Sequence, residues 1–248
     1  MAANNPIEIK TKTFPNGYRI SYRNDCELEV IYNDVFTHNT YFFRTDDPEP
    51  RIVDCGGHIG LAVLYFKSLY PGSRIVTFEP NPETFALLKK NIAQNNLRGV
   101  EAVNMALSCE DDDDAVLYVG KDFLEAWDST DTIKPDLWVD MTQYRSISAR
   151  SARLSSYIAN GVDFIKLDIE GAEYDVLCES RDKIGSVSAI TLEYHQNARN
   201  LAERTLEKTL EILSDAGFGC ELFYQSRPVT LHSLPNDAIY QLIIKATK

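Results

Sequence analysis

The sequence predicts an α/β fold in which a doubly wound, mostly parallel sheet carries helices on both faces. From Arg51 onward, short apolar segments alternate with segments of helical periodicity. The first of these segments ends in glycines, which is typical of a strand followed by a tight turn. With 248 residues and 44% hydrophobic content, the chain can bury one large core. We expect residues 49–248 to form one domain and residues 1–48 to form a β-rich flap on it.

The flap is predicted from composition and turn residues. Residues 17–24, 28–36 and 40–44 are rich in β-branched and aromatic side chains, which favour strands. Prolines at positions 48 and 50 end this part of the chain.

Seven apolar segments are predicted strands of the main domain. They are residues 51–57, 73–80, 100–108, 162–168, 187–195, 219–226 and 238–246. Helical spacing follows residue 60, Gly171 and residue 205, and a further helix is expected to begin at Asn81 as its cap. The last two strands have only a short connection, which predicts an antiparallel pair.

Residues 109–150 lack a clean period and are predicted to be an insertion over the functional site. The acidic run at 110–114 indicates a solvated turn, because a calcium loop needs alternating ligands and a glycine. Trp127 and Trp138 are expected to pack in the core or in a lid over the site.

Charge and composition limit the functional class. The chain has 25 Lys and Arg against 37 Asp and Glu, a net charge of −12, which repels nucleic acid. No apolar run approaches the roughly 20 residues of a membrane span, and the N-terminus does not look like a signal peptide. Five widely spaced cysteines indicate reduced thiols, mostly packed. We expect a cytoplasmic protein with neither membrane nor nucleic acid as partner.

The first strand leads into a glycine-rich loop, residues 54–60. In a doubly wound sheet, ligands bind at the carboxyl ends of the strands, and the amides that open the next helix attract an anionic group. A dinucleotide fingerprint would align Gly57 and Gly60 with its second and third glycines, but Cys55 stands at the first. The loop therefore favours a ligand other than a nicotinamide dinucleotide, although a simple tight turn also explains it.

Two carboxylates indicate which ligand the loop binds. Glu79 ends the second strand, where an acidic side chain accepts hydrogen bonds from ribose hydroxyls. Asp54 at the base of the loop repels a pyrophosphate but suits an ammonium group. S-adenosylmethionine has an ammonium, a carboxylate for the helix amides and a ribose, so it is the predicted cofactor.

Four segments carry a resemblance to a known family. Residues 53–60 (VDCGGHIG), 78–92 (FEPNPETFALLKKNI), 103–108 (VNMALS) and 163–177 (DFIKLDIEGAEYDVL) together resemble the FkbM family of class I S-adenosylmethionine-dependent methyltransferases. The resemblance covers roughly residues 50–195 and implies a Rossmann-like, seven-stranded sheet. In the family the first loop reads DxGANxG, whereas Gly57 and His58 stand here at the Ala and Asn positions.

The resemblance matches Asp54, Gly56 and Gly60 of the first loop and implies that Met105 and Ala106 lie against the adenine. Asp168 closes the fourth strand beside the topological switch, so it is expected to face the sulfonium. The predicted cofactor-binding residues are Asp54, Gly56, Gly57, His58, Gly60, Glu79, Met105, Ala106 and Asp168.

Methyl transfer to a hydroxyl requires a group that takes its proton. Asp168 closes one strand, and Glu193 and His195 close its predicted neighbour. We expect His195 to be the general base, oriented by Asp168 or Glu193, although a surface histidine at a helix start also fits the pattern. Lys166 is expected to pair with Asp168 or Glu193, and Glu173 is expected to act as a helix cap.

A second interpretation of these carboxylates uses a metal. Asp168, Glu170 and Glu193 offer hard oxygen ligands suited to Mg²⁺, which would lower the pKa of the acceptor. The family resemblance does not imply a metal, so a metal-free site is the main expectation.

The predicted function is O-methylation of a small-molecule or natural-product hydroxyl by in-line transfer from S-adenosylmethionine. Methylation of a nitrogen or a carboxylate is an open alternative. Two alternatives belong to other functional classes. They are a nicotinamide-dependent oxidoreductase and a non-catalytic S-adenosylmethionine-binding protein.

Overall fold

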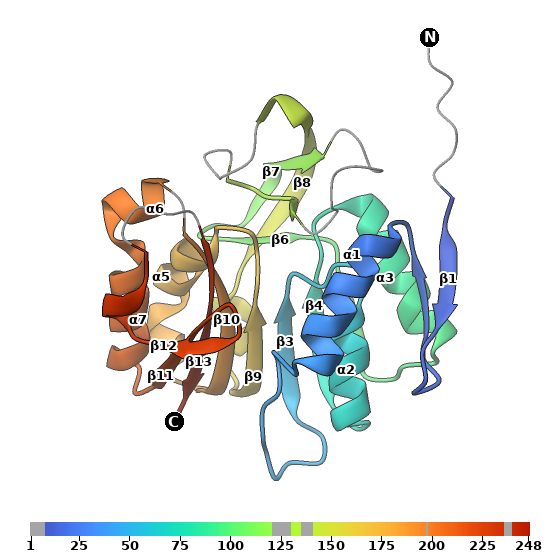
Figure 1. Ribbon diagram of the computed structural model, residues 1–248, viewed down its shortest axis with the longest axis horizontal. Coiled ribbons are helices and arrows are strands. Elements are labelled where there is room, and N and C mark those ends of the chain that lie inside the picture. The colour runs from blue at the N-terminus through green and yellow to red at the C-terminus, as the bar shows by residue number, and fades with distance from the viewer. Residues whose placement is uncertain (1–7, 121–129, 135–140, 197, 236–239) are drawn as a thin grey trace.

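A large central sheet organises the protein. The computed structural model describes residues 8–120, 130–134, 141–196, 198–235 and 240–248 (Figure 1). Eight strands form the sheet, in the spatial order β12 (Arg227–Val229), β11 (Gly219–Tyr224), β13 (Tyr240–Thr247), β10 (Val187–Gln196), β9 (Val162–Leu167), β3 (Arg51–Cys55), β4 (Arg74–Phe78) and β5 (Val100–Val103).

The pairing confirms the predicted mixed sheet. Strands β10, β9, β3, β4 and β5 run parallel to their neighbours in that order, whereas β13 is antiparallel to both β10 and β11. The seven predicted strands are all present, and the three-residue β12 adds an eighth at the edge.

The third predicted strand, residues 100–108, is divided in the structure. Val100–Val103 forms β5 in the central sheet, but Ala106–Ser108 forms β6 in a different sheet. Asn104 lies at the break, and its side-chain amide donates to the carbonyl oxygens of Glu79 at 2.8 Å and Pro80 at 3.0 Å. These bonds fix the chain where it leaves the central sheet.

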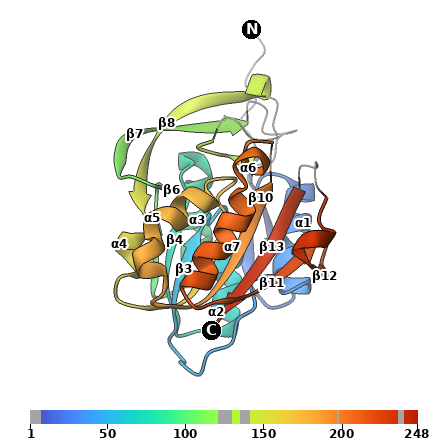
Figure 2. The same ribbon diagram turned by 90° about the vertical axis from the view of Figure 1, so that its left-hand side faces the viewer.

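Helices cover both faces of the sheet, as Figures 1 and 2 show. One face packs against α2 (Leu61–Leu69) and α3 (Pro82–Gln94), and the other against α5 (Glu173–Ile184) and α7 (Thr205–Asp215). The short helices α4 (Ser155–Ile158) and α6 (Ala198–Glu203) complete the second side. Asn81 caps α3 as predicted, because its side chain accepts from the backbone N–H of Glu83 at 2.9 Å.

The N-terminal segment is only partly the predicted β flap. Strands β1 (Lys10–Thr13) and β2 (Arg19–Tyr22) form a hairpin, but α1 (Asp25–Tyr32) and a π-helical turn at Asn33–Thr37 replace the strand predicted at 28–36. No regular element covers 40–44, where a strand was also predicted.

The reason for the helix lies in capping and in its apolar face. The Asn24 side chain accepts from the backbone N–H groups of Cys26 and Glu27, which starts the helix. Leu28 and Val35 are buried seven residues apart, at helical spacing, so the β-branched residues of this segment serve a helix.

The predicted insertion forms a second sheet above the carboxyl end of the central strands (Figure 1). It pairs β6 (Ala106–Ser108), β8 (Tyr144–Arg153) and β7 (Asp112–Gly120) in that order, with a 3₁₀ turn at Met141–Gln143 before β8. The acidic run, predicted as a turn, enters β7, where Asp113 pairs with Arg150 at 2.8 Å. Trp127 and Trp138 lie outside the described residues.

The cysteines are less buried than the sequence predicts. All five cysteines are free thiols, but Cys26, Cys109 and Cys178 are exposed, so the expectation that most are packed is wrong.

Within the part of the chain that the structure describes, none of the helices has the length and apolar composition required to cross a membrane.

Candidate active site

A cavity of about 360 Å³ opens at the carboxyl ends of the central strands. This volume lies within the range of small-molecule sites. The cavity wall combines the loop after β3, the end of β4, residues 105–107, residues 168–170 and Glu193, with further residues from α1 and the small sheet. The cavity therefore lies at the strand ends for which the sequence predicts a site.

The glycines of the first loop are required by packing between strand ends. Gly56 has φ +89°, and a Cβ atom there would lie 1.9 Å from the carbonyl oxygen of Asp168. A Cβ atom on Gly57 would lie 2.2 Å from the hydroxyl oxygen of Thr77. Gly56 and Gly57 line the cavity, whereas Gly60 lies behind the wall as the residue before α2. Close packing of β3, β4 and β9 thus brings the loop backbone to the cavity.

Asp54 lies behind this loop and is fully buried. Its Oδ2 accepts from the Thr77 hydroxyl at 2.7 Å, and its Oδ1 lies 3.7 Å from the ammonium of Lys166. Among the described residues, no donor forms a hydrogen bond to Oδ1. Burial raises the pKa of Asp54, and the charge of Lys166 opposes that shift. The structure gives Asp54 an internal cationic partner, and its contact with a ligand ammonium stays a prediction.

Glu79 lies on the cavity wall and is held by two backbone amides. The N–H of His58 donates to Oε2 at 2.9 Å, and the N–H of Asn81 donates to Oε1 at 2.9 Å. Because a carboxylate oxygen can accept more than one hydrogen bond, Glu79 keeps capacity for a ligand hydroxyl. His58 has φ +46°, and its Nε2 lies 3.6 Å from Oε1 of Glu27 in α1. Sequence reasoning did not identify Glu27, because no local pattern links it to the first loop.

Met105 and Ala106 form an apolar part of the wall, together with Phe78 and Leu107. This surface suits a flat, uncharged ring such as a purine, and the predicted adenine contact stays a prediction.

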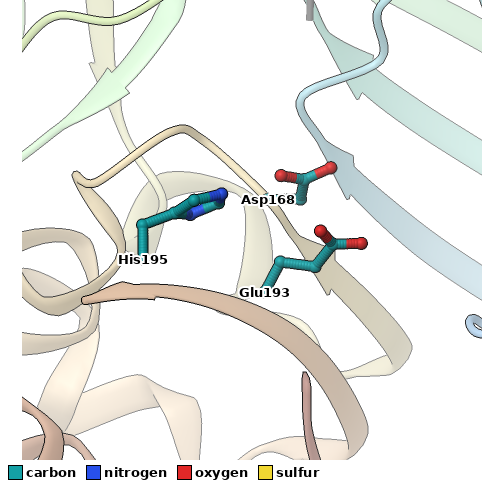
Figure 3. A group of neighbouring side chains, drawn as sticks. All are labelled: Asp168, Glu193 and His195. Atoms are coloured by element: carbon teal, nitrogen blue, oxygen red, sulfur yellow. The ribbon is translucent and has the colours of Figure 1, made fainter. Parts of the chain in front are cut away.

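Three of the predicted residues meet where β9 and β10 end. Ligand atoms of Asp168, Glu193 and His195 all lie within 4.8 Å of one another, and Figure 3 shows the three side chains converging. Adjacent parallel strands bring their carboxyl ends to one edge, which is why the sequence could place these groups together.

Lys166 supplies the buried positive charge of this cluster. Its ammonium lies 3.1 Å from Oδ2 of Asp168 and donates to the carbonyl oxygen of Gly56 at 2.7 Å. The predicted pairing with Asp168 is confirmed. Burial raises the pKa of Asp168, but the charges of Lys166 and His195 and the hydrogen bonds from Lys166 and Tyr41 together outweigh burial and hold that pKa below its usual value. Asp168 is therefore ionised at neutral pH.

Tyr41 also belongs to the cluster, and sequence reasoning missed it. Its hydroxyl lies 2.5 Å from Oε1 of Glu193 and 3.3 Å from Oδ2 of Asp168, and the residue lines the cavity. Tyr41 is one of 13 tyrosines and lies in a stretch without regular structure. No local pattern could have distinguished it.

His195 is buried behind the cavity wall, with 1% of its surface exposed. Its Nδ1 lies 3.0 Å from Oε1 of Glu173, and its Nε2 lies 3.5 Å from Oε2 of Glu170. Glu173 therefore orients the ring through Nδ1. The prediction that Asp168 or Glu193 orients it is wrong. The alternative of a surface histidine is wrong.

Glu173 combines two roles. Its Oε1 accepts from the backbone N–H groups of Ile169 at 3.2 Å and Gly171 at 2.9 Å, which belong to the turn before α5. Because α5 begins at Glu173 and no side chain caps its first turn, the predicted role of Glu173 as a helix cap is wrong, and Glu173 braces the preceding turn instead. The same oxygen contacts His195. Burial lowers the pKa of His195, but the neighbouring carboxyl groups of Glu170, Glu173 and Asp168, with the hydrogen bond to Glu173, together raise that pKa well above 6.5. This shift favours the imidazolium form, which does not accept a proton.

Glu170 and Glu193 are the carboxyl groups of the wall that titrate near neutral pH. Burial, followed by the charge of Asp168, raises the pKa of Glu193 to about 7. Burial also raises the pKa of Glu170 to about 8, although the charge of His195 opposes this shift. A group with a pKa near the working pH is suited to general acid–base chemistry. Glu193 therefore fits the role of proton acceptor better than His195.

A model of the methyltransferase FkbM domain matches residues 54–220, which is more than half of the chain. The chain belongs to the FkbM methyltransferase family. The matched segment starts at Asp54 and includes Asp168, Glu193 and His195, so the family's shared region supplies most of the wall, whereas Tyr41, residues of α1 and Gln241 lie outside it.

Relatives of this FkbM-family protein include Methyltransferase 1 of Beauveria bassiana, which is 33% identical over 168 residues, 61% of this chain and 66% of the relative. A second is the 31-O-demethyl-FK506 methyltransferase FkbM of Streptomyces tacrolimicus, 29% identical over 93 residues, 37% of this chain and 36% of the relative. The matched segments span less than two thirds of either relative.

The fold resembles solved methyltransferases. A crystal structure of methyltransferase FkbM from Methylobacillus flagellatus superposes with a TM-score of 0.53 at 16% identity, covering 86% of this chain and 47% of that one. At this identity the likeness shows the shared Rossmann-like fold, as predicted, and nothing finer.

The strand-end cluster of this FkbM-family protein is a poor fit for a metal ion. Asp168, Glu193 and His195 are close enough to share one. However, Lys166 already neutralises Asp168, Tyr41 contacts Glu193, and Glu173 contacts His195. A divalent ion would compete with the buried ammonium of Lys166 and is not favoured there. The same ammonium weighs against the predicted magnesium set of Asp168, Glu170 and Glu193.

Proposed function

We propose that the protein transfers a methyl group from S-adenosylmethionine to a hydroxyl of a small molecule. The observation that carries this proposal is Glu193, a carboxyl group on the cavity wall whose pKa of about 7 suits proton removal from an acceptor. The match to the FkbM methyltransferase family supports methyl transfer, and this carboxylate favours an oxygen acceptor that needs a base.

The cavity wall fits S-adenosylmethionine, which supplies an electrophilic methyl on a sulfonium when bound. Glu79, held by two amides, is placed to accept from ribose hydroxyls. Met105 and Ala106 offer an apolar surface for adenine. The first turn of α2, where Leu61 and Ala62 line the cavity, presents backbone amides to a carboxylate.

The residues at the strand ends have different roles toward the acceptor. Glu193 accepts the hydroxyl proton, and Asp168, kept ionised by Lys166, orients the acceptor through a hydrogen bond. His195 acts from behind the wall, because its positive charge opposes the rise in the pKa of Glu193. Its predicted role as general base is therefore replaced by a positioning role.

The charge of the wall favours a neutral hydroxyl over a carboxylate acceptor. Lys166 is the only lysine or arginine among the described wall residues. Six carboxyl groups share the wall, namely Asp34, Glu79, Asp131, Asp168, Glu170 and Glu193. An acceptor that carried a carboxylate would be repelled by these groups at short range. The name of the Streptomyces relative, which describes methylation at an oxygen, supports the same choice.

An isotope-transfer assay tests the proposal. The protein is incubated with methyl-labelled S-adenosylmethionine and a panel of hydroxylated small molecules that includes an extract of its own cells, and labelled products are identified by mass spectrometry. We expect label on oxygen, lost in Glu193→Gln and retained in Glu221→Gln, a change at an exposed position on β11. Label on nitrogen or on a carboxylate would contradict the proposal.

A further inference from the structure

We propose that Tyr41 is a positioning residue that holds the carboxylate of Glu193 by a donated hydrogen bond and sets its proton affinity. This inference rests on the proposed function of Glu193 as the base. Tyr41 comes from the N-terminal segment, outside the residues that match the family model. Nothing in the family match therefore assigns it a role.

Tyr41 touches each charged group of the cluster that faces the cavity. Its hydroxyl lies 2.5 Å from Oε1 of Glu193 and 3.3 Å from Oδ2 of Asp168. The ammonium of Lys166 lies 5.2 Å from the centroid of its ring, within the range of a cation–π contact. The residue is 5% exposed, so water does not screen these contacts strongly.

The direction of the hydrogen bond follows from charge. Burial, followed by the charge of Glu193, raises the pKa of Tyr41 well above 10, so the phenol stays protonated and donates. A phenol has one proton, and the shorter distance assigns it to Glu193. Asp168 is held instead by its ion pair with Lys166, whose ammonium lies 3.1 Å from Oδ2.

The groups around Glu193 act on its titration in opposite directions. Burial and the negative charge of Asp168 favour the protonated form. Tyr41, the imidazolium of His195 and the ammonium of Lys166 favour the ionised form. Removal of the Tyr41 hydroxyl therefore makes Glu193 harder to ionise, while the ring can keep its place.

Aromatic packing fixes the segment that carries Tyr41. The ring of Phe43 stacks on Phe164 of β9, with centroids 4.3 Å apart and an interplanar angle of 7°. The hydroxyl of Tyr70 donates to the carbonyl of Phe43 at 3.0 Å and accepts from the N–H of Thr45 at 3.2 Å. Tyr70 thus anchors the same segment without a hydrogen bond to Asp168 or Glu193, which makes it a matched control.

The test compares Tyr41→Phe with Tyr70→Phe. Carboxyl-¹³C-labelled Glu is incorporated into the protein, the Glu193 resonance is assigned with Glu193→Gln, and its titration is followed by NMR in the absence of any acceptor. We expect an apparent pKa near 7 in the native protein. In Tyr41→Phe we expect a rise of about one pH unit, because a hydrogen bond to a charged group has that order of effect. Tyr70→Phe should leave the titration unchanged.

Two results would overturn the inference. One is a Tyr41→Phe titration equal to that of the native protein. The other is an equal rise in Tyr70→Phe, which would make the effect one of general packing. Thermal unfolding of both variants shows whether they are folded, and Tyr41→Leu, which also lacks the phenol and has no side-chain donor, provides a second route if Phe does not fold. Absence of methyl transfer together with the expected shift would refute the proposed function but leave the contact of Tyr41 with Glu193 established.

Discussion

The backbone carbonyl oxygen of Asp168 lies 1.9 Å from the position that a Cβ atom would occupy on Gly56. This contact brings the ends of β3 and β9 together, and Gly56 also has φ +89°. Two independent features therefore require glycine at position 56. One is the positive φ, and the other is that the carbonyl oxygen of Asp168 leaves no room for a Cβ atom.

Gly56→Ala is expected to destabilise the protein more than Gly217→Ala. Both glycines have φ +89°, but a Cβ atom on Gly217 meets nothing within 4 Å. Backbone strain alone costs about 1–3 kcal/mol, and the contact with Asp168 adds to it at Gly56. Urea unfolding of both variants measures the difference. Equal losses of unfolding free energy would show that the two strands separate easily at this point.

Glu79→Ala is expected to weaken binding of S-adenosylmethionine by roughly tenfold to a hundredfold, since hydrogen bonds to a charged group contribute about 1.5–3 kcal/mol. The same change also frees the N–H groups of His58 and Asn81, which loosens the first loop. Calorimetric titration gives the affinity, with Glu101→Ala on the exposed part of β5 as the control. Unchanged affinity in Glu79→Ala would place the ribose elsewhere.

The rate of methyl transfer is expected to rise with pH through about 7. Burial and the charge of Asp168 raise the pKa of Glu193 to that value, and the carboxylate must be ionised to accept a proton. Below this pH the base is protonated, so the rate falls. Above pH 7, Glu193→Gln should lose roughly a hundredfold to ten-thousandfold of the rate, and the loss should become smaller at lower pH, where the native base is itself protonated. A flat pH profile with full activity in Glu193→Gln would assign the base to another group.

Folding stability is expected to fall as pH rises, because of Glu170. Burial raises its pKa to about 8 from the ordinary value of 4.5, so the folded protein keeps a proton that the unfolded chain has lost. This contribution decreases between about pH 4.5 and 8 and is constant above that range. In Glu170→Gln, the unfolding free energy should change less over this range than in the native protein. Chemical denaturation at several pH values measures it, with Glu110→Gln at an exposed site as the control, and equal slopes would contradict the assignment.

The sequence predicted the parts of the site that depend on strand order. Asp168 and Glu193 could be placed together because they end adjacent parallel strands, and Asn81 could be placed as a cap from its position before Pro82. Lys166 could be paired because a buried ammonium needs a partner.

The remaining features depend on contacts between distant segments. Tyr41 reaches Glu193 across 152 positions of the chain, and no local pattern marks such a contact. The contact of Glu173 with His195 depends on side-chain directions at a helix start and a strand end. The helix at Asp25–Tyr32 was missed because its β-branched residues also fit a strand, and only its buried face distinguishes the two.

Calorimetric titration of the native protein with S-adenosylmethionine, and separately with NAD⁺, tests most directly what the cavity binds. We expect one molecule of S-adenosylmethionine to bind per chain and no heat of binding with NAD⁺. Binding of NAD⁺ by a folded sample that does not bind S-adenosylmethionine would contradict the proposed cofactor and, with it, the roles given to Glu79 and Glu193.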